Sequence, residues 1–135
     1  MKHIRYFILI YFALVFFLNS CSTVPITGRS QLNIIPASQM LSMSFSQYDD
    51  FLKTNKLSSN KEQTAMIKRV GLKIQKAVER YFTEHNMSLS LQGYNWEFNL
   101  VESDEANAWC MPGGKVVFYT GILPLTQTET GVAVV

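Results

Sequence analysis

Cysteine, histidine and unbalanced charge are all scarce in this chain of 135 residues. Its two cysteines are Cys21 and Cys110, and its two histidines are His3 and His85. Two cysteines cannot build the set of disulfide bridges that stabilises small secreted domains. A thiol protease needs a histidine beside its cysteine. Neither histidine is expected next to Cys110, so the sequence argues against that class.

The chain also lacks a strong excess of either charge. It has 12 basic and 10 acidic residues, for a formal net charge of +2. Lys2 and Arg5 lie in an amino-terminal leader, and without them ten basic and ten acidic residues remain. We therefore expect no nucleic-acid partner, because such binding needs a basic surface. Repeats and low-complexity tracts are absent, and the length allows one domain.

The amino terminus has the pattern of a secretion signal. Basic residues precede the apolar run Tyr6–Leu18. This run is shorter than the roughly 20 residues that span a bilayer, but it fits the core of a signal peptide. It ends in Leu18-Asn19-Ser20-Cys21, which resembles a bacterial lipobox. The alternative is an ordinary signal peptide followed by a structural cysteine.

The lipobox resemblance implies a lipoprotein signal peptide over residues 1–20, with lipidation at Cys21. The mature protein would then be attached to a membrane through this lipid anchor. The residue after the cysteine is Ser22, and in this feature the chain resembles lipoproteins of the outer membrane. This resemblance implies a location in the bacterial cell envelope, facing the periplasm.

After the leader, we expect a tether over residues 21–37 and a folded part over residues 38–135. The tether is polar and contains Pro and Gly. The spacing of apolar residues predicts a first helix from Ser38 to about Leu52 and a second from Asn60 to about His85. His85 is interpreted as a residue at a helix end, with a metal ligand as the alternative.

Two local patterns refine the second helix. Ser59 and Glu62 have the spacing of a capping box, which predicts where the helix begins. Gly71 lowers the helix propensity and suggests close packing against a neighbour. The acidic stretch Glu102–Glu105 lacks the spacing of a calcium loop, so we interpret it as solvated loop charge.

The carboxyl-terminal third predicts strands. Tyr94–Val101 alternates between apolar and polar residues, as in a half-buried strand. Asn107–Met111 and Lys115–Tyr119 flank Pro112-Gly113-Gly114, which predicts a β-hairpin. The expected fold class is α+β, with helices packed on a small β-sheet that contains this hairpin.

The hairpin residues resemble a known enzyme family. The segment is similar to the one just upstream of the zinc-binding helix in the HtpX/Ste/Oma-type zinc metallopeptidases, peptidase family forty-eight. The Pro25–Leu32 stretch resembles their periplasmic lipoprotein branch. The matching hairpin residues are Asn107, Ala108, Trp109, Pro112, Gly113, Gly114, Val116, Phe118, Gly121, Ile122 and Leu123.

The resemblance implies a gluzincin-type metallopeptidase domain, of which this chain is the N-terminal part. In that family the first hairpin strand borders the active-site cleft, so Asn107, Ala108 and Trp109 are expected to bind substrate. The family holds zinc with His-Glu-x-x-His on the next helix. This sequence lacks that motif, and residues 126–135 look like the start of that helix. We thus interpret the chain as a fragment with no catalytic or metal-binding residue of its own.

The implied function is that of a membrane-anchored zinc metalloendopeptidase acting on protein or peptide substrates in envelope quality control. The fragment alone is expected to be inactive. The alternative is a non-catalytic envelope lipoprotein that binds partners through an exposed β-strand edge. A nonfunctional gene fragment is a third interpretation. Cys110 is interpreted as a small hydrophobic residue, with inhibition of zinc by its thiolate as the alternative.

Overall fold

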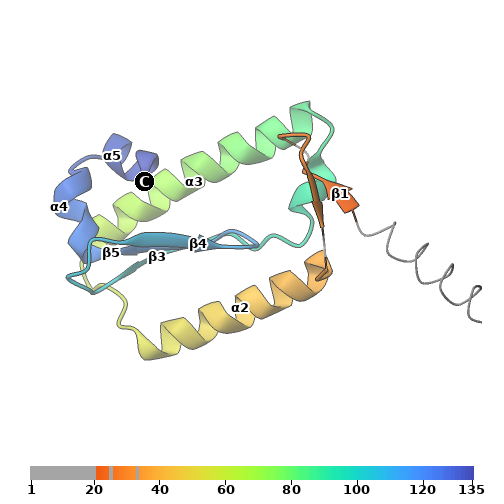
Figure 1. Ribbon diagram of the computed structural model, residues 1–135. Coiled ribbons are helices and arrows are strands. Elements are labelled where there is room, and N and C mark those ends of the chain that lie inside the picture. Colours follow the sequence, from red (N-terminus) through yellow and green to blue (C-terminus); the bar gives the residue numbers. More distant parts are fainter. Residues whose placement is uncertain (1–20, 25, 33) are drawn as a thin grey trace, which may run out of the picture. The chain divides into compact units, whose positions relative to one another are not determined.

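The computed structural model describes residues 21–24, 26–32 and 34–135 of the chain (Figure 1). The predicted signal peptide, residues 1–20, lies outside the described residues. The chain divides into two units, Met1–Pro36 and Ala37–Val135. Across the described ranges, no helix combines the length and the hydropathy needed to cross a bilayer.

The described part of the first unit is a short antiparallel ladder. Strand β1 (Cys21–Thr23) pairs with β2 (Ser30–Leu32). Gly28 has a φ of 65°, and its amide donates to the Val24 carbonyl over 2.9 Å. Glycine adopts this left-handed conformation without a steric cost, which favours the turn. This ladder lies within the predicted tether, where the sequence showed no strand pattern.

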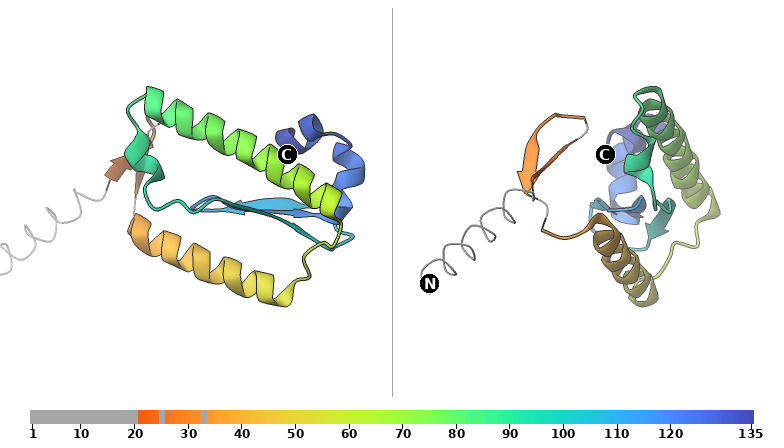
Figure 2. Two further views of the ribbon diagram at one scale, coloured as in Figure 1. Left: turned by 180° about the vertical axis from the view of Figure 1, so that it is seen from behind. Right: turned by 90° about the vertical axis from the view of Figure 1, so that its right-hand side faces the viewer.

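The second unit has a three-stranded sheet between two long helices (Figure 1). The sheet contains β3 (Glu97–Val101), β4 (Ala108–Met111) and β5 (Lys115–Tyr119), in the order β3-β5-β4. One face packs against α2 (Ala37–Thr54) and the other against α3 (Lys61–Glu84), as both views in Figure 2 show. The α+β fold class is confirmed.

Short elements complete this unit. A 3₁₀ turn, η1 (Ser88–Leu91), follows α3. After β5 the chain forms η2 (Thr120–Ile122), α4 (Leu123–Thr126) and α5 (Glu129–Val134). Val132 of α5 is 1% exposed and joins the core between α3 and the sheet. The carboxyl-terminal segment thus packs on the α3 side of the sheet (Figure 1).

Helix α3 begins one residue later than a capping box at Ser59 requires. Asn60 is the N-cap, and its side-chain oxygen accepts a hydrogen bond from the Gln63 amide over 3.1 Å. The predicted capping box is therefore wrong. The Ser59 amide and hydroxyl instead donate to Glu102, which lies after β3. Asn caps a helix as well as Ser does, so a tertiary contact decides between the two.

Strand β3 is shorter and more enclosed than predicted. It begins at Glu97 rather than Tyr94, because the Asn95 and Glu97 amides bond to the hairpin turn. The predicted polar face is covered by α2. There the Asn99 side chain donates to the Tyr48 hydroxyl over 2.9 Å. Tyr48 is fully buried, and burial raises its pKa to about 12.

Gly71 allows α3 to lie directly on the sheet. A Cβ at this position would overlap the Phe98 ring, with Cε1 at 2.6 Å. Both residues are buried in the core between α3 and the sheet. The suggestion of close packing at Gly71 is therefore confirmed.

Candidate functional site

The predicted hairpin and its turn are confirmed, although the first strand begins at Ala108 rather than at Asn107. Ala108 lies opposite Phe118, and Met111 lies opposite Lys115. Gly113 and Gly114 have φ values of 88° and 84°, which other residues rarely adopt. A Cβ on Gly113 would lie 2.5 Å from the Phe45 ring of α2. The turn thus needs glycine for its backbone and for its close approach to a helix.

Three hydrogen bonds hold the turn in place. The Ser44 hydroxyl of α2 donates to the Pro112 carbonyl over 2.7 Å. The Asn95 amide donates to the Gly113 carbonyl over 2.8 Å, and the Glu97 amide donates to the Gly114 carbonyl over 2.9 Å. The hairpin is therefore fixed both to α2 and to the segment that leads into β3.

Strand β4 is an edge of the sheet, because β5 lies between it and β3. The Tyr119 amide donates to the Asn107 carbonyl over 3.0 Å. Hydrogen-bonded pairs alternate along an antiparallel ladder, so Trp109 and Met111 also direct their backbone groups toward β5. The amides and carbonyls of Ala108 and Cys110 consequently point away from β5. Among the described residues, no strand pairs with that side of β4.

The side chains of β4 alternate between two environments. Ala108 packs against the core that includes α3 and α5. Trp109 lies on the α2 face, where its ring centroid is 4.9 Å from that of Phe51. Cys110 shares the face of Ala108 by alternation, and its thiol is exposed.

Asn107 precedes β4 and is held by a neighbouring loop residue. Its side-chain amide donates to Glu105 Oε1 over 3.1 Å, and its backbone amide donates to the Glu105 carbonyl over 3.0 Å. The structure thus places Asn107, Ala108 and Trp109 consecutively along the start of the edge. Their binding of substrate stays a prediction.

An apolar hollow lies on the α3 face of the sheet, beside β4. It has a volume of about 260 Å³. Residues from α3, the sheet and the end of the chain line it, among them Val70, Ile74, Ala108, Cys110, Val116 and Val135.

Helix α5 is held against α3 by ion pairs that the sequence analysis missed. Glu129 lies 2.8 Å from Lys73 and 2.9 Å from Arg69, with separate carboxylate oxygens serving the two cations. Lys73 and then Arg69 hold the pKa of Glu129 below its usual value. Arg69 and Lys73 are one turn apart on α3, but no local pattern indicates a partner near the end of the chain.

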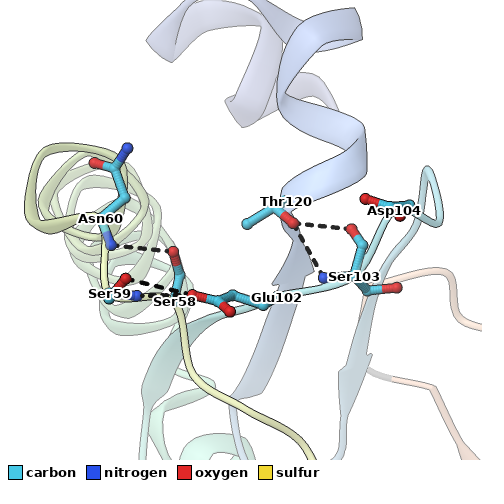
Figure 3. Close-up of a pocket in the computed structure, with 7 residues that line it drawn as sticks. All are labelled: Ser58, Ser59, Asn60, Glu102, Ser103, Asp104 and Thr120. Atoms are coloured by element: carbon cyan, nitrogen blue, oxygen red, sulfur yellow. Dashed lines mark hydrogen bonds between the residues drawn. The ribbon is translucent and has the colours of Figure 1, made fainter.

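A second, polar hollow of about 450 Å³ lies where β3 and β5 end and α3 begins (Figure 3). Glu102 accepts hydrogen bonds there from Ser59 and forms an ion pair with Lys56 over 2.6 Å. Lys56 and then Ser59 hold the pKa of Glu102 below its usual value. Thr120 Oγ1 accepts from the Ser103 amide over 3.0 Å and donates to its carbonyl over 2.9 Å. These residues tie the acidic connection to the helix start.

The described residues do not fit a zinc site. Nowhere in residues 21–24, 26–32 and 34–135 do three His, Cys, Asp or Glu side chains come together. His85 is the C-cap of α3. Its ring stacks on Tyr81 with a centroid distance of 4.1 Å, and its Nδ1 lies 2.7 Å from the Tyr81 carbonyl oxygen. His85 thus lies at a helix end, as predicted.

Comparison with known proteins finds a matching family and similar sequences. The model for peptidase family M48 matches residues 69–135. The mitochondrial metalloendopeptidase OMA1 of Bos taurus is 29% identical over 110 residues, which cover 81% of this chain and 20% of the relative. The OMA1 of Schizosaccharomyces pombe is 27% identical over 124 residues, covering 90% and 34%. That of Arabidopsis thaliana is 36% identical over 62 residues, covering 46% and 13%.

These relatives correct the expected location. Each is named as a mitochondrial enzyme, so the prediction of a bacterial cell envelope, at the outer membrane and facing the periplasm, is contradicted. The chain spans 13% to 34% of the length of the three relatives compared above. The family model matches the segment that contains the edge strand and α5, and together with the similarity to the OMA1 relatives it shows that the chain belongs to peptidase family M48.

Proposed function

We propose that the full-length protein is a zinc-dependent metalloendopeptidase and that this chain supplies the strand along which the substrate peptide lies. The observation that supports this is the outward direction of the Ala108 and Cys110 backbone groups on β4. The metal would be held by residues of the full-length protein other than those described here. Zinc would supply the Lewis acid for peptide hydrolysis.

The chain's own contribution is to bind and align the peptide. An extended peptide can add to a sheet edge through main-chain hydrogen bonds, which are largely insensitive to side chains. Asn107, Ala108 and Trp109 are the proposed substrate-binding residues. Asn107 would mark where pairing begins, because its own amide is already bonded to Glu105. This mode suits broad specificity toward unfolded proteins, in line with a function in protein quality control.

Replacing Ala108 by Pro in the full-length protein tests this mode. Proline removes an amide that points away from β5, and the first residue of a strand tolerates it. Losing one hydrogen bond of about 0.5–1.5 kcal/mol should lower kcat/KM for an unfolded protein substrate by up to about tenfold. Cleavage should also stop on chelation of zinc and return when zinc is added.

Ala108→Ser is the matched control, because it changes the side chain but keeps the amide. It should retain more activity than Ala108→Pro. Equal kcat/KM values for the wild type and Ala108→Pro, with the fold intact by circular dichroism, would refute the edge-strand mode. Tight binding of unfolded protein without any zinc-dependent cleavage would instead favour a non-catalytic protein that binds partners through the same edge.

We also propose that lipidation at Cys21 attaches the mature protein to a membrane. The support is the leader pattern, a basic start and a short apolar run that ends at Leu18-Asn19-Ser20-Cys21. Residues 1–20 would then be a signal peptide, residues 21–37 a tether and residues 38–135 part of the peptidase domain. Cys21→Ala should move the protein from the membrane fraction to the soluble fraction. Retention of this variant in the membrane fraction would contradict the lipid anchor.

A further inference from the structure

We infer that Trp109 gives the edge strand a side-chain preference, selecting an apolar or aromatic residue at one position of the bound peptide. This inference rests on the proposed function, since it assumes that a peptide pairs with β4. It adds a specificity-determining residue to a binding mode that otherwise depends on the main chain.

The direction of the β4 backbone determines which peptide residue meets Trp109. Main-chain bonds to a peptide would come from Ala108 and Cys110, on either side of Trp109. Directly opposite residues on adjacent strands place their side chains on the same face. The peptide residue facing Trp109 therefore lies on the α2 face, whichever direction the peptide runs. In antiparallel pairing this is the closer type of pair, with Cα atoms about 4.5 Å apart.

The surroundings of Trp109 on that face are aromatic. Tyr48 and Phe51 of α2 contact its ring edge-to-face, with centroid distances of 6.2 Å and 4.9 Å. Phe51 also stacks on Tyr119, with a centroid distance of 6.4 Å. Trp109, Phe51 and Tyr119 are each partly exposed. A peptide side chain beside them would gain from apolar contact, whereas a carboxylate would lose hydration. The ammonium of Lys115 lies over the Tyr48 ring, but it is buried and already pairs with Glu97 over 3.1 Å.

The Trp109 ring is already oriented before any peptide binds. Its Nε1 donates to the Tyr119 hydroxyl over 3.3 Å, and its ring plane lies at 86° to that of Phe51. A side chain held by its neighbours loses little entropy when a partner is added. On the opposite face, the β4 side chains Ala108 and Cys110 are small, and they line the apolar hollow described above. We therefore expect the ordered Trp109 ring to give the sharper selection at the single peptide position that faces it.

The test uses the full-length zinc-loaded protein and a set of extended peptides that carry Leu at every position around the cleaved bond. Asp or Phe is placed at one position at a time, and kcat/KM is measured for each peptide. The wild type should discriminate against Asp most strongly at one position. Trp109→Ala should weaken that discrimination by roughly fivefold, the upper size of a cross-strand pair effect, and only at that position.

Leu52→Ala is the matched control for lost packing. Leu52 packs partly buried against the same cluster, but it lies on α2 and not on the edge strand. Its loss should leave the Leu-to-Asp ratio unchanged at every position. Should Trp109→Ala fail to fold by circular dichroism, Trp109→Leu replaces it, and the Phe-over-Leu preference at the same position should then fall.

The outcomes separate this inference from the proposed function. Cleavage by a folded Trp109 variant with an unchanged preference at every position would overturn the specificity role and leave the protease intact. An equal shift in Leu52→Ala would overturn it too, because general loosening would then explain the effect. Absence of zinc-dependent cleavage by the wild type would overturn the proposed function, and this inference with it.

Discussion

Adding one methyl group at Gly71 should destabilise the fold by forcing α3 away from the sheet. A Cβ there would lie 2.6 Å from Phe98 Cε1, whereas carbon atoms in contact are about 3.5–4.0 Å apart. The helix or the ring must therefore move by about 1 Å. Phe98 is only 8% exposed and Trp96 stacks on it, so its ring has little room to turn away.

Two effects of Gly71→Ala oppose each other. Ala is favoured over Gly within a helix by about 1 kcal/mol. Overpacking a core costs about 1–3 kcal/mol, and this overlap with the base of a ring calls for the upper part of that range. We expect a net loss of about 1–2 kcal/mol in the free energy of unfolding, by difference between these two terms.

Equilibrium urea unfolding, followed by circular dichroism and tryptophan fluorescence, measures this loss as a lower midpoint at constant slope. Ala77→Gly calibrates the helix term, because Ala77 is exposed on the same helix. Phe98→Leu, combined with Gly71→Ala, should recover about 1 kcal/mol relative to the sum of the single changes. A stabilised Gly71→Ala variant, or strictly additive effects in the double variant, would refute the proposed overlap.

Two further predictions concern charged groups. Lys115 is buried at 3% exposure, pairs with Glu97 over 3.1 Å and lies over the Phe45 ring. Glu97→Ala would leave this buried ammonium without its carboxylate, so it should lower the free energy of unfolding by about 1–3 kcal/mol. Lys115→Met should cost less in the same urea assay because Glu97 stays partly exposed, and a larger loss for Lys115→Met would contradict this account. The pKa of Glu129 is lower in the folded state than its ordinary value of 4.5. Its ion pairs with Lys73 and Arg69 therefore stabilise α5 fully at pH values above 4.5, and this stabilisation is lost as the pH falls through the lower pKa of the folded state. The protection factor of the Val132 amide against hydrogen exchange should therefore fall in acid more in the wild type than in Glu129→Gln, and an equal fall in both proteins would count against a stabilising role of these ion pairs.

Local patterns sufficed for the elements whose geometry depends on neighbours in sequence. The apolar stripe of α3 placed that helix to within a residue of its observed ends, because periodicity repeats over many turns. Gly113 and Gly114 predicted the hairpin, because few other residues adopt positive φ values. In this hairpin Trp109 lies opposite Val117, so Tyr119 is its diagonal neighbour on the same face. The position of the turn in the sequence could therefore have predicted the contact between Trp109 and Tyr119.

Contacts distant in sequence decided the remaining features. The capping pattern at Ser59 failed because Glu102 engages that residue instead. The polar face of β3 was expected to be solvated, yet α2 covers it and brings Tyr48 to Asn99. Neither contact leaves a local trace, since the partners are 43 and 51 residues apart.

The sequence by itself determined the hairpin, the two long helices and the residues that mark peptidase family M48. Only the tertiary structure decided that β3 pairs in parallel with β5, which places β4 at the edge. It also decided that Trp109 lies on the α2 face and Cys110 on the face of α3. The physical reason is that turns and periodicity depend on near neighbours, whereas strand order and the covering of each face depend on which distant surfaces pack together.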